Sequence, residues 1–87
     1  MFTVTEAALD RLSCKLAHKK AADEMAMRFA EKAGGWRLRL DRQSPDDTVF
    51  AHRGRNVLLV DKAVARTMND RTLDTRNTAG GPRLTLR

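Results

Sequence analysis

The chain has 87 residues, enough for one small domain with a thin core, because a chain this short buries only about 60–65% of its unfolded surface. Seventeen Lys and Arg against eleven Asp and Glu give a net charge of +6, which favours acidic or phosphate-bearing partners. No apolar run reaches the ~18 residues of a membrane span, and the N-terminus lacks the pattern of a secretory signal. A single cysteine excludes an internal disulfide, so we expect a cytoplasmic protein.

The N-terminal third predicts a short strand followed by a helix. Residues 2–4 suit a strand, and Thr5 is a helix N-cap with Glu6 in the favourable first turn. An apolar stripe at helical spacing follows, formed by Leu9, Leu12 and Leu16. We therefore expect a helix from Glu6 to Lys19 or Lys20.

The next segments predict an antiparallel hairpin. Residues 25–30 and 36–41 alternate between apolar and polar side chains and are separated by Gly34-Gly35. Such alternation is typical of strands with one buried and one solvated face.

The remaining chain predicts more strands and one short helix. Residues 43–48 have the composition of a turn, and Arg53-Gly54 joins a strand at 48–52 to an apolar strand at 56–60. Asp61 can cap a short helix, and two last strands flank Ala79-Gly80-Gly81. The prediction is a β-rich α+β fold with antiparallel or mixed strands and two helices, and we expect residues 1–87 to be a single domain.

This order of elements, with these residues at the turns and element ends, resembles the HesB/IscA family, the A-type carriers of iron–sulfur cluster assembly. The matching segments are "VTEAA", "AMRF", "DTVFAHRGRNVLLVD", "TLD" and "GPRLTL". Positions that the family usually fills alike are Asp47, Val49, Phe50, Gly54, Val57, Val60 and Asp61. The resemblance covers nearly the whole chain and implies a HesB-like fold.

The chain departs from the family at the residues that bind the cluster. Members that carry clusters have a cysteine just after the "AMRF"-type strand and a Cys-Gly-Cys on a C-terminal tail. Here the first position falls at Ala33 or Gly34, and the chain ends at Arg87, about where the tail would begin. Because clusters need thiolates, we expect a degenerate member of the family that keeps the scaffold and binds no cofactor.

Cys14 and His18 are weak candidates for a metal site. They are four residues apart on the first helix, on the face opposite the leucine stripe. A dimer could combine four such ligands, but an incidental exposed thiol is the simpler interpretation, since metal sites usually need three or four ligands. The other histidine, His52, is expected to be solvated.

Arginines are the stronger candidates for a binding surface. Arg28, Arg37 and Arg39 are expected to point outward from the hairpin, and Arg83 and Arg87 share one face of the last strand. If these strands belong to one sheet, the basic face would suit an acidic protein or a phosphate backbone. No aromatic residue is interleaved for base stacking, which counts against nucleic acid, and a solvated surface is the alternative.

No pattern of a catalytic site is present. There is no nucleophile elbow and no phosphate-binding Gly-rich loop, and Asp46-Asp47 is best explained as part of a turn. We expect a non-enzyme with an accessory or protein-interaction role related to iron–sulfur cluster assembly, with an acidic partner from that machinery. The alternatives are a basic anion- or nucleic-acid-binding module and a metal or thiol role for Cys14 with His18.

Overall fold

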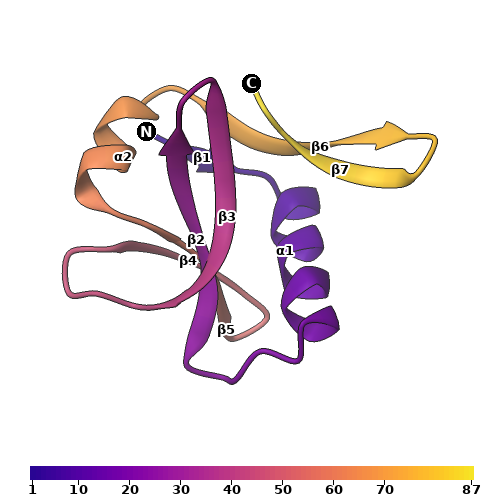
Figure 1. The fold of residues 1–87 in the computed structure, drawn as a ribbon, viewed down its shortest axis with the longest axis horizontal. Helices are drawn as coiled ribbons and strands as arrows, with labels where there is room; N and C mark the ends of the chain where they lie inside the picture. Colours follow the sequence, from indigo (N-terminus) through magenta and orange to yellow (C-terminus); the bar gives the residue numbers. More distant parts are fainter.

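The structure is a computed structural model that describes all 87 residues, and its main helix contacts strands of two separate β-sheets (Figure 1). The elements, in chain order, are β1 (Thr3–Val4), α1 (Glu6–His18), β2 (Met25–Lys32), β3 (Gly35–Arg42), β4 (Thr48–His52), β5 (Arg55–Val60), α2 (Lys62–Thr67), β6 (Thr72–Thr78) and β7 (Gly81–Leu86). The predicted α+β fold with an N-terminal helix and a short second helix is confirmed. No helix in it is long and apolar enough to cross a lipid bilayer.

The larger sheet has four strands in the order β3-β2-β5-β4. β2 and β3 form the predicted antiparallel hairpin, and β4 and β5 form a second one. The two hairpins join through a parallel β2–β5 pairing that aligns Met27 with Leu58 and Phe29 with Val60. The smaller sheet, β1-β6-β7, also combines a parallel pair with an antiparallel pair, so both sheets are mixed.

Tight turns close the hairpins where the sequence places glycine. Gly34 has φ +80° in the β2–β3 turn. Between β4 and β5, Arg53 and Gly54 have φ values of +52° and +79°. Positive φ at both central residues is the geometry of the two-residue turn that matches the twist of paired strands, and glycine adopts it without a steric penalty.

The hydrophobic core lies between α1 and the two sheets. Leu12 and Leu16 on α1 are completely buried, as the leucine stripe predicts. They belong to one apolar cluster with Phe29 of the larger sheet and Leu73 of the smaller one. The amphipathic helix therefore holds the two sheets together.

Both helices begin with a side-chain cap. Thr5 Oγ1 accepts a hydrogen bond from the Ala8 amide at 3.2 Å and donates one to Asp74 Oδ1 at 2.8 Å. Asp61 Oδ1 accepts from the Val64 amide at 2.8 Å. The predicted caps thus supply partners for backbone amides that the helices leave unpaired.

Candidate functional site

Arg28 lies in the centre of an ion-pair cluster on the face of β2 that points away from α1. Its guanidinium donates two hydrogen bonds to the carboxylate of Asp47, at 2.7 and 2.8 Å, and its Nε donates to Asp41 Oδ2 at 2.7 Å. The Arg42 carbonyl accepts a further hydrogen bond at 3.1 Å. Only 9% of the Arg28 side chain and 2% of the Asp47 side chain are exposed.

The expectation that Arg28 points freely into solvent is therefore wrong. The strand alternation placed it on the correct face, but the loop before β4 brings Asp47 over that face and covers it. The turn at Ser44–Asp47 forms as predicted: the Ser44 carbonyl accepts from the Asp47 amide, and Asp47 Oδ2 accepts from the Ser44 amide. A partner cannot reach Arg28 without opening this turn.

The cluster stabilises the charged form of each member. The hydrogen bonds from Arg28 lower the pKa of Asp47 and of Asp41, and the Ser44 and Arg42 amides add to the effect. Conversely, Asp47 and then Asp41 raise the pKa of Arg28 despite its burial. The arrangement is that of a structural ion pair whose donors and acceptors are already occupied.

The other predicted arginines do not form one basic face. Arg37 and Arg39 are exposed on β3, with Arg39 3.8 Å from Asp41. Arg83 and Arg87 belong to the other sheet, because β7 pairs with β6 and not with β3. Arg87 forms an ion pair of 2.9 Å with Asp74. The predicted basic face required β2, β3 and β7 to belong to one sheet, and β7 lies in a different sheet from β2 and β3.

The metal-ligand candidates lie apart from the turn where the family places its first cysteine. Cys14 and His18 are both exposed on α1. Ala33 and Gly34 form the β2–β3 turn, at the top of Figure 1, whereas α1 lies at the lower right. No three His, Cys, Asp or Glu side chains lie close enough together to hold a metal ion.

The side chains of these 87 residues do not fit an iron–sulfur cluster. A cluster requires soft thiolate donors, and neither residue of the β2–β3 turn carries a donor side chain. Cys14 is the single thiol, on a different element. These 87 residues therefore offer no set of ligands for an iron–sulfur cluster held by this chain alone.

His52 is buried, which corrects the expectation of a solvated residue. Its side chain is 5% exposed and lies against α1, with Nδ1 3.5 Å from Glu6 Oε1 and Nε2 3.5 Å from Asp10 Oδ1. Both carboxylates are themselves exposed. The sequence around His52 did not reveal this contact, because the contact depends on how β4 packs against α1.

A basic groove that the sequence did not reveal lies between α1, β3 and β7. Its volume is about 510 Å³. Its lining residues are Arg11, Lys15, Lys19, Met27, Trp36, Leu38, Arg83 and Leu84. Half of them are cations, half are apolar, and none is acidic. The i, i+4, i+8 spacing of the first three cations was the available sequence signal, since it places them along one side of a helix.

By sequence, the chain matches no protein-family model and no curated protein. By structure, it is similar to SufA from Escherichia coli, a protein involved in the biosynthesis of iron–sulfur clusters. The TM-score is 0.74 at 19% identity, over 99% of this chain and 83% of SufA. It is also similar to IscA solved with a [2Fe-2S] cluster, with a TM-score of 0.64 at 18% identity, over 100% of this chain and 84% of IscA. The chain therefore has the HesB/IscA-like fold of the A-type iron–sulfur carriers.

Proposed function

We propose that this chain is a non-catalytic, cytoplasmic accessory protein of iron–sulfur cluster assembly that acts by binding another protein and holds no cluster of its own. One combined observation supports this role. The fold of SufA and IscA extends over essentially the whole chain. Yet the β2–β3 turn carries Ala33 and Gly34 at the position where the family resemblance implies a cysteine in cluster carriers. A retained scaffold without the ligand suits recognition better than carriage.

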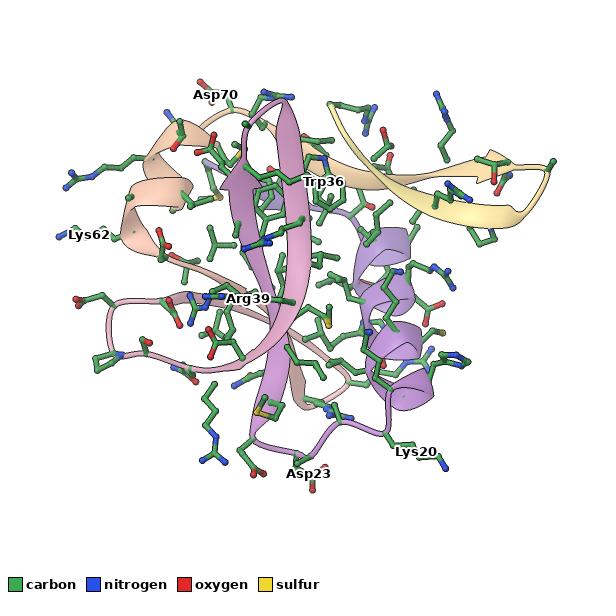
Figure 2. The ribbon with its side chains drawn as sticks, in the orientation of Figure 1. Lys20, Asp23, Trp36, Arg39, Lys62 and Asp70 are labelled. Atoms are coloured by element: carbon green, nitrogen blue, oxygen red, sulfur yellow. The ribbon has the colours of Figure 1, made fainter.

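The proposed contact surface consists of Arg37 and Arg39 on β3. Both side chains are exposed, and the 3.8 Å distance between Arg39 and Asp41 leaves the Arg39 guanidinium only weakly paired. Arg39 extends from the side of β3 opposite Trp36 (Figure 2). Exposed arginines can form two-pronged hydrogen bonds with carboxylates, so the partner chemistry is an acidic protein surface.

A comparison of variants tests the interaction. The tagged protein is recovered from nuclease-treated extract of its own cells in three forms: wild type, Arg37→Glu with Arg39→Glu, and Lys62→Glu with Arg66→Glu. The last pair makes the same charge change on α2, away from β3. We expect an iron–sulfur assembly protein to be retained by the wild type and the α2 control and to be missing from the β3 variant. Absence of such a protein, or equal retention by all three, contradicts the proposal.

Reconstitution tests the absence of a cluster. The protein is incubated anaerobically with ferrous iron and sulfide, and bound iron and visible absorption are measured after desalting. We expect no stoichiometric iron and the same result for Cys14→Ser. Stoichiometric iron that depends on Cys14 would instead establish the metal role for Cys14, with His18 as the first ligand to examine.

A further inference from the structure

We propose that the basic groove between α1, β3 and β7 binds single-stranded nucleic acid, with the phosphates on its cations and a base stacked on Trp36. This site is independent of the accessory role proposed above. It also differs from the sheet face that the sequence suggested, and shares only Arg83 with it.

The cations of the groove are not engaged by protein carboxylates. Arg28, Arg39, Arg42 and Arg87 each have an acidic side chain within 4.0 Å, whereas Arg11, Lys15, Lys19 and Arg83 have none. The Nε of Arg11 is buried without a hydrogen-bond partner. Four unpaired cations and no acidic residue in one groove favour an anionic occupant.

The spacing of the cations favours an extended polyanion over a single phosphate group. Arg11, Lys15 and Lys19 follow one side of α1 and its C-cap at intervals of four residues, which is about 6 Å per step along the helix. The row is therefore about 12 Å long, too long for one phosphate group to contact both ends. Interaction with the helix dipole accounts for Lys15 in the last turn, but not for Arg83 on β7.

Trp36 supplies an aromatic surface beside these cations, which the strand pattern alone did not indicate. One side of its indole stacks on Phe29, with ring centroids 5.1 Å apart and an angle of 19° between the planes. Trp36 is nevertheless only partly buried and lines the groove, on the α1 side of β3 (Figure 2). An aromatic ring supported from below, beside a row of cations, is the arrangement on which single-strand binders stack a base. The carboxylates of an acidic peptide would match the charge but would make no use of the ring.

The protein carries its own probe of this groove, because Trp36 is its one tryptophan and it has no tyrosine. We would titrate the wild type with an oligothymidylate of about twelve nucleotides, within the site sizes of single-strand binders, and follow the indole fluorescence. We expect saturable quenching that weakens steeply with salt. Polyglutamate and inorganic polyphosphate are the comparison polyanions. Equal binding and quenching by either one, or no quenching by the oligonucleotide, would overturn the proposal.

Charge-removing variants test whether the oligonucleotide binds in this groove, with binding followed by the fluorescence anisotropy of a labelled oligonucleotide. Lys15→Gln with Lys19→Gln should weaken binding at least about tenfold and lower the salt slope by about 1.4, because each substitution leaves one phosphate of the single strand without its cation. Lys62→Gln with Arg66→Gln removes the same charge from α2, on the other side of the molecule (Figure 2), and should change binding less than about twofold if the interaction is local. Equal weakening in the two double variants would mean binding by net charge alone and would contradict the site.

Trp36→Leu tests stacking separately from charge. It should weaken binding about fivefold or more while leaving the salt slope unchanged, since stacking releases no counterions. Because Trp36 packs on Phe29, circular dichroism must first show that the variant is folded. Trp36→Phe keeps an aromatic face and should recover most of the affinity. An unchanged affinity in a folded Trp36→Leu variant would contradict the stacking interaction.

Discussion

Arg28 and Asp47 form a two-pronged ion pair, with N–O distances of 2.7 and 2.8 Å, that ties the loop before β4 to the outer face of β2. The pair has a structural consequence. Asp47 would otherwise be a nearly fully buried carboxylate, and Arg28 would be a buried cation in the middle of a strand. Each charge is tolerated because the other is present, so the loss of one partner costs more than the loss of both.

We expect Arg28→Met to lower the free energy of unfolding by about 3–5 kcal/mol, because it leaves Asp47 buried without a cation. Urea unfolding followed by circular dichroism gives the value. Arg37→Met, at an exposed site on the neighbouring strand, is the matched control and should stay within about 0.5 kcal/mol of the wild type. Arg28→Met combined with Asp47→Leu should recover part of the loss. A single variant as stable as the wild type would show that the pair is not needed.

Three carboxylates with lowered pKa values, two of them in the Arg28 cluster, make stability depend on pH in the acid range. The folded-state pKa values of Asp41 and Asp47 are lowered, mainly by Arg28, and that of Asp74 is lowered, mainly by the Thr5 hydroxyl. Groups with a lowered pKa bind protons less readily when folded. Their contribution is therefore complete above the unfolded value of about 3.9 and is lost as the pH falls through the lower folded values.

We therefore expect the free energy of unfolding to fall progressively below about pH 4, measured by urea titrations at successive pH values. Arg28→Met should make this fall shallower, because Asp41 and Asp47 then lose the hydrogen bonds that lower their pKa values. Parallel curves for the variant and the wild type would show that Arg28 does not govern the acid response.

Thr5 should matter more than an ordinary helix cap. Thr5→Ala removes the acceptor for the Ala8 amide and also the donor to Asp74, which joins α1 to β6. We expect a loss of about 1–2 kcal/mol in thermal or urea unfolding, and a return of the Asp74 pKa toward its ordinary value, measurable by carboxyl NMR. Thr5→Ser keeps both hydrogen bonds and should stay close to the wild type. An unaltered Asp74 titration in Thr5→Ala would contradict the proposed link.

Leu12 should be among the most sensitive apolar positions. Its side chain is completely buried in the cluster that joins α1 to both sheets, so Leu12→Ala should cost about 2–5 kcal/mol through reduced burial and a cavity. Cys14→Ala, two residues away on the exposed face of the same helix, should change stability by less than about 0.5 kcal/mol. Similar losses of stability at the two positions would contradict a special role for burial at Leu12, because alanine is the best helix former and helix propensity cannot account for either loss.

The sequence by itself determined the local elements of this protein. Thr5 and Asp61 cap their helices as predicted, and the first helix ends at His18 with Lys19 as its C-cap, within one or two residues of the expected end. The turns at Gly34 and Gly54 also form where expected. These features depend on residues a few positions apart, so hydrogen-bonding groups, glycine and apolar spacing are sufficient to specify them.

Tertiary structure decided which charges remain available for binding. Arg28 and Arg39 are opposite each other in the β2–β3 register, yet only Arg39 stays exposed, because Asp47 reaches Arg28 from a loop 19 residues away in the chain. Trp36 lies beside the cations of α1 and β7 only after two separate sheets have packed on one helix. Alternation along a strand assigns a side chain to a face, but it carries no information on which distant segment covers that face.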